Sequence, residues 1–247
     1  MSYEKPFLLR IATIPMSLEL LLEGQMSFMK RKGFHVEVAS ADGNGVEVLV
    51  RKEGVKHHVL PLKRSIAPLN DLKSLWATYL LIQKLKPDIV HTHTPKAGLI
   101  GMLAATLAGT SVRIHTVAGL PLMTSTGLKR QILILVEMLT YICAHHVWPN
   151  SVSLETFILE NKLTRRSKLK VIGNGSSNGI DTNSFSSASI DLGILGEIKS
   201  SLGYECDNYY FVYVGRILKD KGIEELVEAF MSLKSRWPNI KLLLVGP

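Results

Sequence analysis

A short stretch near the C-terminal end of the sequence, Val214-Gly215-Arg216 to Lys221-Gly222, combines glycines with two cations. It follows an apolar run and precedes an amphipathic segment, so we expect it to join a strand to a helix. Glycines let the backbone approach a ligand closely, and a helix N-terminus favours an anion. Arg216 can bind two phosphate oxygens at once, and Lys221 adds a point charge. On this chemistry alone, a phosphate-binding loop and an ordinary loop with surface cations are equally good interpretations.

Three histidines stand at the ends of two other predicted strands. His91 and His93 are two residues apart and therefore share a face of their strand, and His115 lies on the next predicted strand. Together they have the residue types of a metal site. The only carboxylate in these segments is Asp88, at the far end of its strand, so the sequence argues against a metal. Structural hydrogen bonding at strand ends is the alternative role.

The segments that must position these residues alternate between short β-branched runs and longer helical stretches. Such alternation predicts an α/β fold with a doubly wound parallel sheet. Thr94-Pro95 is expected to cap a helix, Lys86-Pro87 to end the preceding one, and Gly109 to stop the next. The predicted strands are 7–13, 35–41, 56–62, 88–94, 112–117, 146–150 and 169–173, and the predicted helices are 17–32, 69–85, 96–108, 128–144 and 152–161.

The composition changes after residue 175, where serine, asparagine, glycine and aspartate dominate. We predict an N-terminal Rossmann-like domain over 1–180, an interdomain linker over 181–208 with a short helix near 193–202, and a strand–helix–strand (βαβ) unit over 209–247. That unit is far shorter than a typical domain of about 100 residues. We therefore interpret it as the truncated start of a second Rossmann-like domain.

Composition also limits the partners and the compartment. Two distant cysteines, the lack of a long apolar run and the lack of a signal peptide predict a cytoplasmic protein. The net charge of +8 suits nucleic acid, an anionic membrane or phosphorylated substrates, but no aromatic residues interleave with the basic clusters, which argues against nucleic acid. The apolar helix from Ile132 to Ala144 is interpreted first as a buried core helix. Docking on an anionic membrane surface, at the inner face of the cell membrane, is the alternative.

The Gly-Arg and Lys-Gly pairs, followed by an amphipathic helix, resemble the donor-phosphate motif of retaining glycosyltransferase family 4. Asn178-Gly179-Ile180-Asp181 resembles the segment that leads out of the first domain in that family. The resemblance implies the GT-B architecture of two facing Rossmann-like domains. The sequence around Leu22-Glu23-Gly24-Gln25 is similar to that of a bacterial subset of the family, whose members build capsule, O-antigen or N-linked glycans. The paired glycines that many members carry after the first strand are missing here.

The resemblance also implies roles for individual residues. Gly215, Arg216, Lys221 and Gly222 would bind the diphosphate of a nucleotide sugar, with Arg216 and Lys221 as its direct contacts. His115 would be the catalytic-site histidine near the transferred sugar, and the acceptor-side residues would be Lys96, His93 and Thr116. No metal and no cofactor is implied.

The expected reaction is transfer of a hexose or N-acetylhexosamine from a nucleoside diphosphate sugar, in particular a UDP-sugar, to a polyprenyl-diphosphate-linked saccharide. Members of the family also carry a downstream acidic motif, which has no counterpart before Pro247. We therefore expect this polypeptide alone to have little or no transferase activity. Two alternatives stay open: a sugar-nucleotide epimerase, and a non-catalytic remnant or module that binds an acceptor or partner.

Overall fold

The computed structural model describes residues 5–65 and 67–247. The chain separates into two compact units, residues 1–179 and 180–247. Each unit is described by itself.

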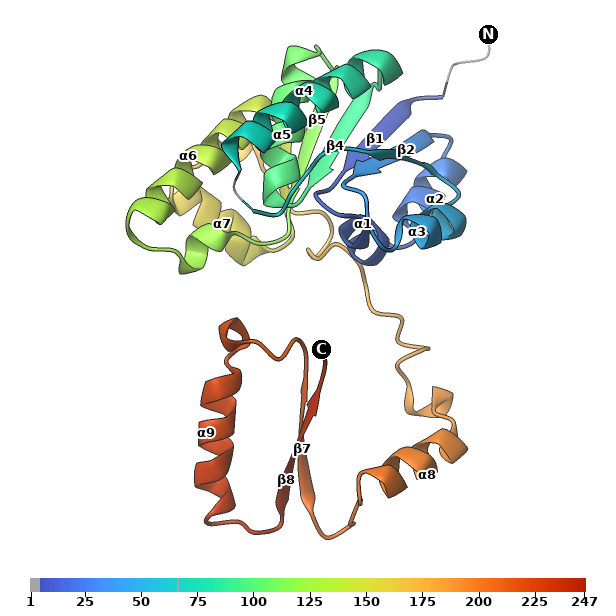
Figure 1. Ribbon diagram of the computed structural model, residues 1–247, viewed down its shortest axis with the longest axis vertical. Coiled ribbons are helices and arrows are strands. Elements are labelled where there is room, and N and C mark those ends of the chain that lie inside the picture. The colour runs from blue at the N-terminus through green and yellow to red at the C-terminus, as the bar shows by residue number, and fades with distance from the viewer. Residues whose placement is uncertain (1–4, 66) are drawn as a thin grey trace. The chain divides into compact units, whose positions relative to one another are not determined.

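The first unit is built on a six-stranded, wholly parallel sheet (Figure 1). The strand order is β3-β2-β1-β4-β5-β6, so the direction of winding reverses between β1 and β4. Open α/β sheets bind ligands at such a reversal, near the carboxyl ends of the strands. The α/β parallel-sheet prediction is confirmed. The strands are β1 (Phe7–Ile11), β2 (His35–Ser40), β3 (Lys56–Val59), β4 (Ile89–His93), β5 (Val112–Val117) and β6 (His146–Pro149).

Alternate residues of the strands point into two apolar clusters, one on each face of the sheet. Leu8, Val36 and Val38 pack with residues of the helices that connect β1 to β3, whereas Leu9 and Ile11 pack in the larger cluster below the later helices. The first group is α1 (Pro15–Leu21), α2 (Gln25–Arg31) and α3 (Val46–Glu53). The second group is α4 (Pro68–Leu85), α5 (Pro95–Leu107) and α6 (Gly127–Cys143), and α7 (Val152–Glu160) follows β6.

Three predicted elements differ from the structure. The expected helix 17–32 is two helices, because Gly24 takes a left-handed conformation (φ 74°) and its N–H donates to the Glu53 carboxylate. The helix α3 was not predicted, although glycines with positive φ flank it on both sides. The expected strand 169–173 is wrong: Leu169 makes a single parallel bridge to Val147. Gly173 (φ 57°) then turns the chain before a ladder can form.

The predicted ends of two helices are confirmed, but one predicted helix cap is wrong. α4 ends at Leu85, just before Lys86-Pro87, and Gly109 (φ 73°) follows the end of α5. Thr94 precedes α5 as expected, yet its side chain does not cap the helix. Its hydroxyl instead forms a hydrogen bond of 2.7 Å with the hydroxyl of Thr13, across the β1–β4 boundary.

The interpretation of α6 as a buried core helix is wrong. Its buried residues are Glu137, Thr140, Tyr141 and Cys143, whereas most of its large aliphatic side chains are exposed. Across the part of the chain that the structure describes, no helix has the length and apolar content needed to span a bilayer.

The second unit begins with α8 (Leu192–Ser201), whose N-terminus is capped by the Asp191 carboxylate. Two parallel strands follow, β7 (Tyr209–Val214) and β8 (Ile240–Val245), with the 3₁₀ turn η4 (Lys219–Lys221) and the helix α9 (Ile223–Lys234) between them. This is the strand–helix–strand arrangement predicted from the sequence. Phe230 of α9 packs edge-on against Phe211 of β7.

Candidate functional site

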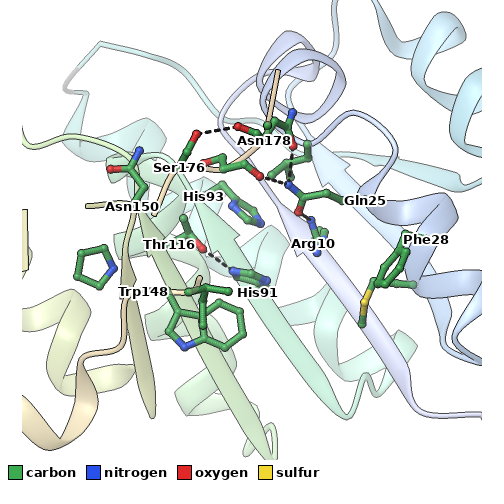
Figure 2. Close-up of a pocket in the computed structure, with 16 residues that line it drawn as sticks. Arg10, Gln25, Phe28, His91, His93, Thr116, Trp148, Asn150, Ser176 and Asn178 are labelled. Carbon is green, nitrogen blue, oxygen red and sulfur yellow. Dashed lines mark hydrogen bonds between the residues drawn. The ribbon is translucent and has the colours of Figure 1, made fainter. Parts of the chain in front are cut away.

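A cavity of about 430 Å³ opens over the reversal point of the sheet in the first unit (Figure 2). Its floor consists of side chains on one face of four successive strands. Arg10 of β1 pairs in register with His91 of β4, and His93 pairs with Thr116 of β5. Trp148 of β6 completes the row. The alternation of side chains along each strand is what brings these residues to the same face.

Arg10 is the one cation among the described residues that line this cavity, and it is only 6% exposed. Its Nη1 donates to Oε1 of Gln25 at 2.7 Å, and its buried Nε has no hydrogen-bond partner among the residues that the structure describes. Burial lowers the pKa of Arg10 to about 10, against the attraction of Glu53. The guanidinium therefore stays charged at neutral pH but lacks a carboxylate in direct contact.

His91 and His93 lie beside this cation, with ring centroids 4.2 Å apart. The Nε2 of His91 is 2.8 Å from the Thr116 hydroxyl, whereas the buried Nε2 of His93 has no partner within the described ranges. Burial, together with the nearby positive charges, holds the pKa of both imidazoles well below the ordinary value. Both rings are therefore neutral at pH 7 and can each donate and accept a hydrogen bond.

One wall of the cavity is the segment Ser176–Gly179, at the end of the first unit. The amide of Gln25 donates to the Ser177 carbonyl (2.7 Å) and to Oδ1 of Asn178 (2.9 Å), so one side chain links this wall to Arg10. Gly175 makes the approach possible, because its φ is 89° and a Cβ there would lie 2.5 Å from the Asn150 carbonyl oxygen.

The chemistry of the lining suits a polar ligand that carries negative charge. Among the described residues that line the cavity, none is an aspartate or glutamate. Amide and hydroxyl groups surround the arginine, and Phe28 and Trp148 supply aromatic surface (Figure 2). Such a site offers hydrogen bonds to hydroxyls, a ring face for a sugar and one charge for a phosphate or carboxylate.

His115 does not face this cavity. It pairs in register with Thr92, on the opposite face of the sheet, and its Nδ1 is 2.8 Å from the Thr92 hydroxyl. The ring lies against the backbone of α5, where a Cβ on Gly98 would be 2.4 Å away. Burial lowers the pKa of His115 to about 4.

A smaller cavity of about 100 Å³ lies beside His115 and also contacts Glu137 of α6. Burial raises the pKa of Glu137, and the hydroxyl of Tyr141 lowers it by a smaller amount, so that the pKa is about 6. This cavity therefore pairs a carboxyl that titrates near neutrality with an imidazole that stays neutral.

The structure thus separates the predicted residues of the first unit. His93 and Thr116 come together in the larger cavity, whereas His115 lies beside the smaller one, which Thr116 also lines. Lys96 lines neither: its Nζ is 2.7 Å from Oδ1 of Asp71 and also donates to the Ser65 carbonyl. The described residues contain no group of three or more histidines, cysteines or carboxylates placed to hold a metal ion.

The predicted phosphate loop of the second unit leaves the carboxyl end of β7 and enters α9, as the sequence indicated. The N–H of Gly215 donates to the Val245 carbonyl, and the Tyr213 hydroxyl donates to the Arg216 carbonyl, both at 2.9 Å. Gly222 has a left-handed φ of 73° and begins α9. The side chains of Arg216 and Lys221 are exposed.

Reasoning from the sequence missed most of the larger cavity. Arg10 did carry a signal, because a charge inside an apolar strand needs a partner or a function. Gln25 and Asn178 stood in segments that resemble the family, but no role was assigned to either, and Trp148 carried no signal. Each of the three reaches the cavity only through the tertiary packing of separate elements.

Two family models match most of the chain between them. Residues 22–175, more than half of it, match the model described as "Glycosyl transferase 4-like domain". Residues 196–247 match the one described as "Glycosyl transferases group 1".

Two curated relatives are similar in sequence. The chain is 42% identical over 226 residues to the capsular polysaccharide biosynthesis glycosyltransferase CapM of Staphylococcus aureus, covering 92% of this chain and 57% of that protein. It is 33% identical over 172 residues to an Escherichia coli UDP-Gal:α-D-GlcNAc-diphosphoundecaprenol α-1,3-galactosyltransferase, covering 68% of this chain and 42% of that protein. The chain therefore spans about half the length of the curated relatives it matches.

A solved structure shares the fold. The crystal structure of Anabaena HepE in complex with UDP and glucose superposes with a TM-score of 0.70 at 19% identity, covering 99% of this chain and 61% of that one. At this identity the likeness concerns the fold alone.

Proposed function

The chain belongs to the glycosyl transferase 4-like family, and from that premise we propose that it takes part in transfer of a hexose or N-acetylhexosamine from a UDP-sugar to a polyprenyl-diphosphate-linked saccharide. The product would be a bacterial surface polysaccharide such as capsule or O-antigen, formed with retention of the anomeric configuration. The names of both curated relatives describe sugar transfer, and one acts on a diphosphoundecaprenol-linked acceptor. Those names favour transfer over sugar-nucleotide epimerisation.

The observation that carries the proposal is the buried Arg10 in a cavity whose described lining residues include no carboxylate. An acceptor of this class joins a sugar, rich in hydroxyls, to a diphosphate. Arg10 supplies the cation for the diphosphate, and its Nε, which has no partner among the described residues, can donate to it. His93 and Thr116 supply hydrogen bonds, and Trp148 supplies a surface for the sugar ring.

The donor side of the proposal rests on the loop between β7 and α9. Arg216 and Lys221 would bind the diphosphate of the nucleotide sugar and stabilise the negative charge that develops on it as the bond to the sugar breaks. Gly215 and Gly222 would let the backbone approach that group. His115, neutral and held by Thr92, would help to orient groups near the transferred sugar.

Calorimetric titration with UDP tests the donor assignment. We expect the 247-residue chain to bind UDP, and Arg216→Ala or Lys221→Ala to weaken binding about 10-fold or more, because each removes a charge-assisted contact. Arg236→Ala, another exposed arginine of the second unit, is the matched control and should leave the affinity unchanged. If the chain binds no UDP, or if all three variants bind it as the parent does, the donor assignment is wrong and a binding module without a donor site is favoured.

A further inference from the structure

Two helices on one face of the first unit expose rows of large apolar side chains. On α4, Leu69, Leu72, Trp76 and Leu80 are between 49% and 83% exposed. On α6, Leu128, Ile132, Leu135, Leu139 and Ile142 are between 41% and 77% exposed. The spacings of three and four residues place each row along one side of its helix. Because α5 packs between α4 and α6 (Figure 1), the two rows belong to one surface, here called the α4–α6 face.

Both helices of this face bury polar side chains beside apolar ones, although their outer sides are apolar. The side of α4 opposite Leu72, Trp76 and Leu80 buries the hydroxyls of Ser74 and Thr78, which bond to backbone carbonyls of the chain itself. Likewise α6 buries Glu137 and Thr140 while it exposes Leu128, Leu135 and Leu139. Exposed rows of large apolar side chains of this kind are typical of a contact with another molecule or with lipid.

The charges around the face have one sign. Residues 63–143 contain nine lysines and arginines but only three acidic residues. Each of the three is engaged away from this surface: Asp71 pairs with Lys96, Asp88 accepts the N–H of Phe7, and Glu137 is buried. Lys73 and Lys84 flank the apolar row of α4, and Lys129 flanks that of α6; all three are exposed.

We propose that the α4–α6 face docks on an anionic lipid bilayer. Leucine and isoleucine side chains enter the boundary between headgroups and acyl chains, as amphipathic helices do, and the flanking lysines bind the anionic headgroups. Trp76 has the amphipathic ring that favours this depth. A protein partner would need an apolar centre surrounded by acidic residues to complement this face. An anionic bilayer supplies both an apolar interior and negatively charged headgroups. The face lies on the other side of the sheet from the Arg10 cavity.

Vesicle flotation tests the proposal with the 247-residue chain. We expect binding to vesicles of phosphatidylcholine and phosphatidylglycerol at low salt, much weaker binding to phosphatidylcholine alone, and loss of binding at high salt. The double variants Leu135→Gln/Ile142→Gln and Lys73→Glu/Lys129→Glu should each lower the partition coefficient about 10-fold or more. Brominated phosphatidylglycerol should quench the fluorescence of the chain, and Trp76→Phe should remove most of that quenching.

Matched changes on exposed residues of the second unit serve as controls. Leu192 is 80% exposed, so Leu192→Gln alters an equally accessible leucine, and Lys241→Glu reverses an equally exposed charge. Both should bind vesicles as the parent does. The proposal is overturned if the parent fails to float at low salt, or if the face variants float equally well. It is also overturned if light scattering finds a dimer that Leu135→Gln/Ile142→Gln dissociates, because the face would then join two copies of the chain.

Discussion

Two buried ionisable residues show how single side chains distinguish function from packing in this protein. Arg10 lies within a parallel sheet without a carboxylate in contact, an arrangement that contributes little to stability because burial of the charge is not compensated. Glu53, by contrast, accepts hydrogen bonds from the N–H groups of Gly24 and Ser27 and so holds the start of α2 in place. In the proposed function the cation in the first situation binds a ligand, whereas the carboxylate in the second supports the backbone of α2.

Glu137 gives a prediction about pH. Its pKa is raised to about 6 from an ordinary value of 4.5, so the folded protein binds the proton more tightly than the unfolded chain does. Its contribution to stability is therefore complete below pH 4.5 and is lost as the pH rises through about 6. Glu137→Gln keeps a neutral side chain at every pH. The free energy of unfolding of the variant, minus that of the parent, should rise by about 2 kcal/mol between pH 4.5 and 7.

Urea denaturation of both proteins between pH 4.5 and 7 measures this difference in unfolding free energy. The contributions of the other titrating groups cancel to first order, because both proteins contain them. Glu160→Gln, at an exposed position on α7, is the control and should follow the parent curve. Parallel curves for Glu137→Gln and the parent would contradict the raised pKa.

At the scale of elements, the sequence predicted what local patterns determine. Six of the seven strands expected in the first unit form, because continuous β-branched runs suit strands covered on both faces. Two of the predictions that failed depended on contacts distant in sequence. Glu53 holds Gly24 and divides an apparently continuous helix, and Thr13 takes the hydroxyl that should have capped α5. That His93 and Thr116 share a face could be predicted from strand alternation. The wall formed by Ser176–Gly179 could not, because its place depends on the path that the chain takes back to the cavity after β6.

That wall gives a prediction about two glycines. Gly173 and Gly175 both have positive φ, but a Cβ at Gly173 would meet open space, whereas one at Gly175 would lie 2.5 Å from the Asn150 carbonyl oxygen. Gly173→Ala should cost about 1 kcal/mol of unfolding free energy, from backbone strain alone. Gly175→Ala should cost roughly 3 kcal/mol, because the overlap with backbone adds to that strain. Equal losses in urea denaturation would show that the wall does not pack as described.

At the scale of the whole molecule, the charge and the chemistry are unevenly distributed. The excess of cations gathers in residues 63–143, around helices that expose leucines, while the candidate acceptor cavity lies on the other face of the same sheet. The second unit carries the candidate donor loop. This separation predicts that the two ligands of the proposed transfer bind independently, and that a change at either site leaves the other intact.

The measurement that tests this account most directly is titration of Arg10→Met with N-acetylglucosamine diphosphate esterified to farnesol, alongside the parent chain. The account predicts that the variant binds this compound about 10-fold or more weakly, binds UDP as the parent does, and loses no unfolding free energy. N-acetylglucosamine without the diphosphate should bind both proteins equally weakly. Unchanged affinity of Arg10→Met for the diphosphate-linked sugar would contradict the assignment of the cavity to the acceptor.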